Sequence, residues 1–145
     1  MLRYFFKKKL QLALLSFVFG ACQSEFVCPI PNVERFEFQI VMPTAEIMTA
    51  KTRKDYGYKK SKGVIVFRYN SADPEVFAFD ATCPDSEACM EADNGKIAHD
   101  GYGYGVCQRC KARYSLSDGR HTSKKIMLRP YSVEKMATDF FRVRN

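Results

Sequence analysis

The sequence predicts an all-β fold, a β-sandwich or small barrel, and three observations lead to this prediction. Between residues 33 and 42, apolar Phe36, Phe38 and Ile40 alternate with other side chains, as in a strand with one buried face. Short apolar segments then recur along the chain and are separated by polar turns. The chain has 12 Phe and 8 Tyr but no Trp, and aromatic residues favour strands over helices.

The predicted elements follow one another as short strands. They are expected over residues 33–42, 63–69, 76–82, 95–98, 104–106, 112–116, 126–133 and 140–144. A helical turn is predicted over 45–51, because Pro43 just before it suits a helix start. Pro130 has no N–H to donate to a neighbouring strand, so the segment around it is expected at a sheet edge or a bend.

The first 21 residues have the pattern of a signal peptide. A basic segment with Lys7–Lys9 is followed by an apolar run from Leu10 to Phe19, then by Gly20 and Ala21. The apolar run is shorter than the ~20 residues that span a bilayer. Cys22, directly after Gly-Ala, resembles the lipobox cysteine of bacterial lipoproteins, which is lipidated and becomes the mature N-terminus. The alternative is an ordinary secretory signal with an incidental cysteine.

This pattern divides the chain into a lipoprotein signal peptide (1–21), a lipidated N-terminus with a linker (22–32) and a β domain (33–145). We therefore expect a protein of the bacterial cell envelope, anchored to a membrane by its lipid on the periplasmic or outer-membrane face. Removal of the signal peptide, which has four basic and no acidic residues, lowers the formal net charge from +7 to +3. The remaining basic cluster, 51–62, is expected to be a solvated loop, with contact to anionic headgroups as the alternative. No nucleic-acid partner is expected.

Four cysteines fall into two groups, Cys83 with Cys89 and Cys107 with Cys110. The two-residue gap between Cys107 and Cys110 lets both sulfurs face one ion. Cys83, Cys107 and Cys110 are candidate metal ligands, and Cys89 or, alternatively, Asp85 would complete the set. Four thiolates suit tetrahedral zinc or a [2Fe-2S] cluster, and such soft ligands exclude calcium and magnesium.

The residues around these cysteines resemble the Rieske family. Residues 79–85 (Phe-Asp-Ala-Thr-Cys-Pro-Asp) are similar to its first cysteine motif, and Cys107-Gln-Arg-Cys110 is similar to the second. The segments 114–119 and 128–131 are similar to the aromatic-to-glycine tail and the later proline loop. Together with a lipobox, this arrangement resembles Rieske-like lipoproteins of Bacteroidetes-type bacteria. The resemblance implies a β domain with two cysteine-bearing loops, a metal or iron–sulfur site and electron transfer with a redox partner protein.

Both histidine positions of the Rieske ligand set are changed here, to Asp85 and Cys110. A Rieske cluster has two histidines on one iron, and these raise its potential. A high-potential Rieske centre is therefore not expected. His99 and His121 have no ligand spacing to a cysteine, and both are expected at the surface.

Two other chemistries remain open for these cysteines. In an oxidising compartment they would form disulfides and hold no cofactor, which leaves a binding or structural module. The extra disulfide of some Rieske proteins implies a Cys89–Cys110 bridge, with Cys83–Cys107 as the second, although four cysteines allow three pairings. Thiol–disulfide exchange at Cys107 and Cys110 is the other chemistry, but such motifs normally open a helix and this one leads toward a strand. No catalytic triad or phosphate loop is found in the sequence, so an independent enzyme is not favoured.

Overall fold

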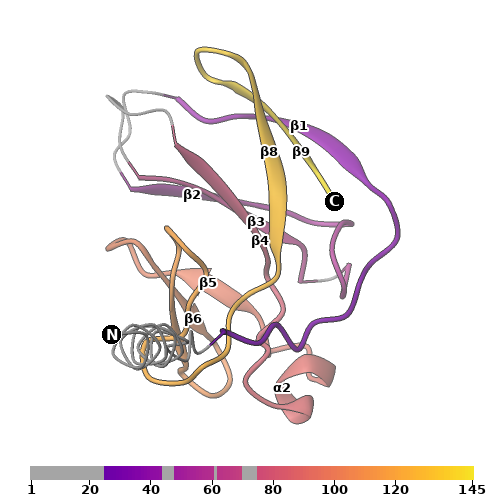
Figure 1. Ribbon diagram of the computed structural model, residues 1–145, viewed down its shortest axis with the longest axis vertical. Coiled ribbons are helices and arrows are strands. Elements are labelled where there is room, and N and C mark those ends of the chain that lie inside the picture. Colours follow the sequence, from indigo (N-terminus) through magenta and orange to yellow (C-terminus); the bar gives the residue numbers. More distant parts are fainter. Residues whose placement is uncertain (1–24, 44–47, 61, 70–74) are drawn as a thin grey trace, which may run out of the picture.

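The described residues fold into two antiparallel β-sheets and a short helix (Figure 1). The computed structural model describes residues 25–43, 48–60, 62–69 and 75–145. The larger sheet is curled and has six strands in the spatial order β1-β9-β8-β4-β3-β2. Its strands are β1 (Glu37–Val41), β2 (Thr49–Arg53), β3 (Val64–Arg68), β4 (Val76–Asp80), β8 (Pro130–Ala137) and β9 (Phe140–Arg144).

The smaller sheet carries the second cysteine loop. Its three strands are β5 (Ile97–His99), β6 (Tyr104–Cys107) and β7 (Arg113–Ser115), in that spatial order. Helix α2 (Glu87–Glu91) lies in the connection from β4 to β5. Figure 1 shows the small sheet and α2 at the opposite end of the molecule from the tip of the β8–β9 hairpin. The predicted all-β fold with two cysteine-bearing loops is confirmed.

Strand β3 joins the two halves of the core, because all five of its residues are buried. Successive side chains of a strand point to opposite faces. Val64 and Val66 therefore enter the cluster inside the curled sheet, together with Phe38, Phe141 and Val143. Ile65 and Phe67 enter a second cluster between β3, β4 and the small sheet, which also contains Cys83, Cys89 and Cys107. The small sheet thus packs directly on the other face of β3 and β4.

The predicted helix over 45–51 is wrong where the structure describes it. Residues 44–47 lie outside the described part, but Thr49–Arg53 is strand β2 and pairs antiparallel with β3. The β-branched threonines of this segment suit a strand, and pairing with a fully buried neighbour outweighs the local helix preference.

Pro130 begins an inner strand of the large sheet, so the predicted edge strand is wrong; Pro130 itself pairs only with Phe79 of β4, because the pairing of β8 with β9 begins at Ser132. Strand β8 stands between β4 and β9. Pro130 is the first residue of β8, a position where a missing N–H interrupts no earlier ladder bond.

The described N-terminal residues pack against the domain. Val27 forms a parallel bridge with Ile126, and Ile30 is fully buried. The Arg129 guanidinium donates to the Ile30 carbonyl, with Nε 2.8 Å from the oxygen. The predicted signal peptide and Cys22 lie outside the described residues. Within the described ranges, no helix has the length and apolar character needed to cross a bilayer.

Candidate metal centre

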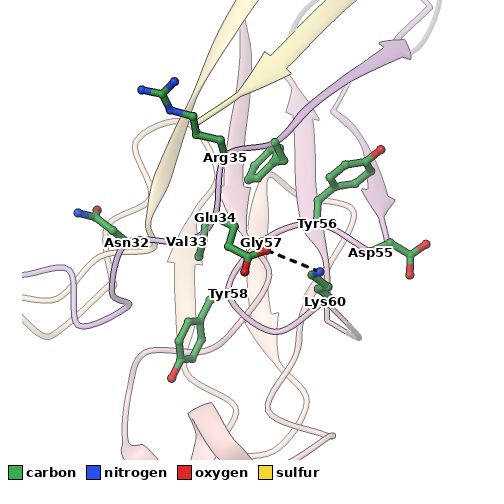
Figure 2. A pocket seen from close by; sticks show the side chains of 10 residues that line it. Asn32, Val33, Glu34, Arg35, Asp55, Tyr56, Gly57, Tyr58 and Lys60 are labelled. Atoms are coloured by element: carbon green, nitrogen blue, oxygen red, sulfur yellow. Dashed lines mark ion pairs between the residues drawn. The ribbon is translucent and has the colours of Figure 1, made fainter.

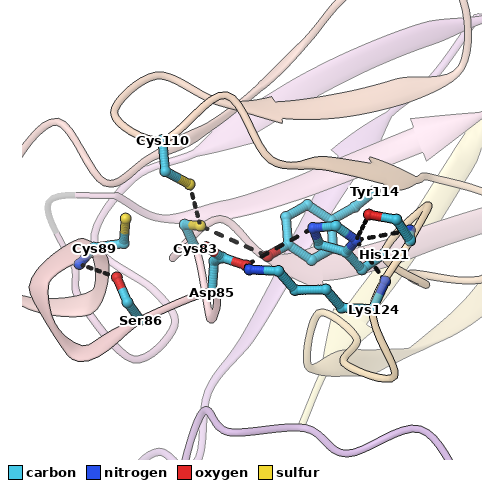
Figure 3. A network of polar contacts seen from close by, with 9 residues as sticks. Cys83, Asp85, Ser86, Cys89, Cys110, Tyr114, His121 and Lys124 are labelled. Atoms are coloured by element: carbon cyan, nitrogen blue, oxygen red, sulfur yellow. Dashed lines mark hydrogen bonds and ion pairs between the residues drawn. The ribbon is translucent and has the colours of Figure 1, made fainter.

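Two loops bring four cysteine sulfurs together beside the small sheet. The first loop follows β4 and supplies Cys83 and, from α2, Cys89; the second joins β6 to β7 and supplies Cys107 and Cys110. The four Sγ atoms all lie within 4.8 Å of one another. Figure 3 shows the side chains of Cys83, Cys89 and Cys110 converging from these loops. The two groups predicted from their spacing therefore form one cluster.

Backbone hydrogen bonds fix the first loop. The Cys83 N–H donates to the Gly95 carbonyl at 2.9 Å. Ser86 is the N-cap of α2, and its hydroxyl accepts from the Cys89 N–H at 3.3 Å. Gly95 is required here because a Cβ at this position would lie 1.7 Å from the Cys89 carbonyl oxygen. The close approach of Gly95 holds α2, and with it Cys89, against the start of β5.

The second loop is a tight turn that presents its two thiols on one side. Cys107 is the last residue of β6, and its N–H donates to the Ala112 carbonyl at 2.9 Å. Lys111 donates its N–H back to the Cys107 carbonyl at 3.1 Å and has a φ of 64°, in the left-handed region. The chain then enters strand β7. No helix follows Cys110, so the thiol-activating helix N-terminus of exchange motifs is missing from this described segment.

Lys62, in the turn just before β3, anchors helix α2. Its side chain is buried, and its ammonium donates to the carbonyls of Cys89, at 3.2 Å, and Met90. Lys59, nearby in the same segment, pairs with Glu91 of the helix at 3.0 Å. The basic cluster 51–62 is therefore not simply a solvated loop, since its last lysine is an internal contact of the first cysteine loop.

Burial disfavours the ionised form of the first cysteine. Cys83, Cys89 and Cys107 are buried, whereas Cys110 is exposed. Burial raises the pKa of the Cys83 thiol far above its usual range, although the backbone N–H of Asp85 opposes this shift. The hydroxyl of Tyr114 lies 3.7 Å from the Cys83 sulfur, and burial raises the pKa of this phenol as well. A cation among the sulfurs would reverse this balance, because a coordinated thiol is deprotonated outright.

Asp85 does not join the four sulfurs. Its carboxylate pairs with the Lys124 ammonium and lies 3.8 Å from His121 Nε2, on the side away from Cys89 (Figure 3). His121 is buried, contrary to the surface position predicted for it, and packs edge-on against Tyr114 with ring centroids 5.0 Å apart. Its Nδ1 accepts the N–H groups of Ser123 and Lys124, which fixes the ring toward Asp85.

Sequence reasoning missed several residues that position the site. Lys62, Ser86, Gly95, His121 and Lys124 were not predicted there. Lys62 and Lys124 reach it from far along the chain, and no periodic pattern marks such contacts. Ser86 lies three residues before Cys89, which is the spacing of an N-cap, and this is the local signal from which α2 could have been predicted.

A second concave feature lies apart from the cysteines. A cavity of about 440 Å³ is lined by residues 32–36, 55–58 and Lys60, and Glu34 and Lys60 form a 4.0 Å ion pair across it (Figure 2). None of the four clustered cysteines lines this cavity. It is therefore separate from the candidate metal centre.

Comparison with known proteins finds similar solved structures. No protein-family profile and no curated protein matches the sequence. A structure named as the small subunit of an NADH-dependent nitrite reductase from Mycobacterium tuberculosis has 14% identity and a TM-score of 0.42, covering 78% of this chain and 97% of its own. The Escherichia coli protein NirD has 20% identity and a TM-score of 0.44, covering 77% of this chain and 98% of its own.

A third similar structure is the oxygenase–ferredoxin complex of carbazole 1,9a-dioxygenase. It has 18% identity and a TM-score of 0.46, and the match covers 74% of this chain but 27% of the compared chain. These similarities concern the backbone structure. The chemistry of the cysteine cluster follows from its own geometry.

Proposed function

We propose that this protein presents a cysteine-ligated metal centre formed by Cys83, Cys89, Cys107 and Cys110. One observation carries the proposal: four sulfurs from two separate loops lie within 4.8 Å of one another. Four clustered thiols are a ligand set for zinc or for iron, and three of them are buried away from solvent.

Electron transfer with a partner protein is the activity that an exposed ligand supports. Cys110 is exposed while the other three cysteines are buried, so the site has one thiol at the molecular surface. Bound iron supplies one-electron chemistry, whereas zinc has none and would only hold the two loops together. Iron would make the protein an electron carrier, with Cys110 marking the face where a partner docks.

We further propose that the protein is anchored in the bacterial cell envelope through Cys22. The basic segment, the apolar run and Gly20-Ala21-Cys22 support this. Incorporation of a labelled fatty acid into the protein in bacterial cells tests it. Label should appear in the wild-type chain and disappear in Cys22→Ser. Equal labelling of both proteins, or of neither, would contradict the anchor.

Metal analysis of the full chain purified without oxygen tests the metal centre. We expect bound zinc or iron in the wild-type protein and its loss in Cys110→Ala. The matched control is Cys28→Ser, which removes a half-buried thiol outside the cluster and should keep the metal. Metal-free wild-type protein with about two free thiols per chain, those of Cys22 and Cys28, or about one where the Cys22 sulfur is lipidated, would instead establish the disulfide-linked module. Full metal content in Cys110→Ala would refute the ligand assignment.

A further inference from the structure

We propose that the centre holds a single ion in a tetrahedron of four thiolates, and not a two-iron cluster. This inference rests on the proposed metal centre and specifies its kind. The Rieske resemblance implies two irons, but the positions of the sulfurs and of Asp85 in this chain do not fit that arrangement.

The distances between the sulfurs are those of one tetrahedron. Zinc–sulfur bonds of about 2.3 Å in tetrahedral geometry place each pair of sulfurs roughly 3.8 Å apart. The Cys83 and Cys110 sulfurs are 3.7 Å apart, and the largest separation in the group is at most 4.8 Å. In a two-iron cluster the two pairs of thiolates bind opposite irons, with the bridging sulfides between them. Sulfurs of different pairs are then held further apart than one tetrahedral edge.

Cys83 and Cys110 have a short sulfur–sulfur separation, although a Rieske arrangement would place these two positions on different irons. In that arrangement the two cysteine positions, here Cys83 and Cys107, bind one iron, and the two histidine positions bind the other. Those histidine positions are Asp85 and Cys110 in this chain. Cys83 and Cys110 would therefore belong to different irons, yet their sulfurs stand at the separation expected around one ion.

Asp85 is occupied elsewhere, and Cys89 replaces it as the fourth ligand. The Asp85 carboxylate is held by Lys124 and faces His121. Cys89 comes from helix α2, which Lys62 and Gly95 hold in place. Cys83, Cys89 and Cys107 also belong to one packed cluster with Ile97 and Leu116, so the surrounding core resists spreading of the sulfurs.

Metal and acid-labile sulfide per chain decide between the two kinds of centre. We expect one zinc or one iron per chain and no labile sulfide in the full chain purified without oxygen. Zinc makes the centre structural and iron makes it redox-active, and either supports a single ion. Two irons with about two labile sulfides would overturn this inference and leave the metal centre standing. No metal, even after anaerobic addition of Zn²⁺ or Fe²⁺, would overturn both.

Titration with Co²⁺ gives an independent count on metal-free, reduced full-length protein. Thiolate-to-cobalt absorption should saturate at one equivalent in the wild type. Asp85→Asn and Cys28→Ser should keep this end point, whereas Cys89→Ser should lose at least about tenfold in affinity. Circular dichroism shows whether each variant is folded. Saturation at two equivalents, or a loss in Asp85→Asn with none in Cys89→Ser, would refute the four-thiolate tetrahedron.

Discussion

The large and the small sheet are stabilised in different ways. The large sheet has strands of five to eight residues and encloses its own apolar cluster, which contains Phe38, Phe141 and Val143. The small sheet has strands of three or four residues, and three of the eleven buried residues in its cluster are cysteines. The strands of the small sheet are too short to form a core alone. It depends on the back of β3 and β4 and, with metal bound, on the cysteines.

This difference separates folding from metal binding. The large sheet is the foundation on which the loops are placed, and damage to it should reduce the amount of folded protein without changing what folded protein binds. The small sheet and α2 form the site itself. Mutations in the small sheet or α2, or loss of the metal, should first cause local unfolding of this region.

The largest expected effect comes from the core of the large sheet. Phe141 is 1% exposed, and Phe141→Ala should lower the free energy of unfolding by about 3–5 kcal/mol, because a large cavity replaces the ring. Urea denaturation measures this change. Val41→Ala, at an exposed position of neighbouring β1, is the control and should change stability by less than about 0.5 kcal/mol. Metal bound per folded chain should stay at the wild-type value. A loss of metal from the folded Phe141→Ala protein would contradict the separation of folding from metal binding.

Removal of the metal is the next largest change. Chelation should lower amide hydrogen-exchange protection in α2, β5, β6 and β7 by about a hundredfold, or about 2.7 kcal/mol, because the bound ion connects both loops. Protection in β3, β8 and β9 should change little. Mass spectrometry of exchanged peptides distinguishes these regions. Equal loss of protection in both sheets would show that the molecule is one cooperative unit.

Lys62 links the two regions, and its removal should weaken the site from the large-sheet side. Lys62→Met removes hydrogen bonds from a charged donor to the Cys89 and Met90 carbonyls, at a cost of about 1.5–3 kcal/mol. Metal affinity should fall at least about tenfold, as measured by competition with a chelating dye. Lys60→Met is the control, since Lys60 has an exposed ion pair with Glu34 worth less than about 1 kcal/mol. Equal affinity in both variants would rule out this role of Lys62.

The smallest expected effect is a pH dependence from the small sheet. Burial lowers the pKa of His99, although Asp100 opposes the shift. As the pH is lowered below about 6.5, the unfolded chain therefore binds a proton at this histidine before the folded chain does. The free energy of unfolding decreases as the pH is lowered through this range. His99→Gln should flatten this dependence relative to the wild type in urea titrations of metal-free protein. A slope that is unchanged, or steeper in the variant, would contradict it.

Sequence patterns predicted most strands and the two cysteine groups, because both signals are local. Alternation located β1, and continuous apolar runs located β3 and β4. Within the segment predicted as a helix, residues 49–51 tolerate either state, and their pairing with β3 favours a strand. The burial of His121 and the reach of Lys62 depend on contacts between segments distant in the chain. Such contacts produce no regular spacing of residues in the sequence, so they could not be predicted from it.

Both faces of β3 are buried, and this limits how the sequence can change over evolutionary time. Insertion or deletion of one residue between Val64 and Phe67 would exchange the two faces and send each side chain into the other cluster. The large sheet and the metal loops would then fail in the same mutational event. We therefore expect related chains to vary in length at the turns that flank β3 and to keep the residue count within the strand unchanged.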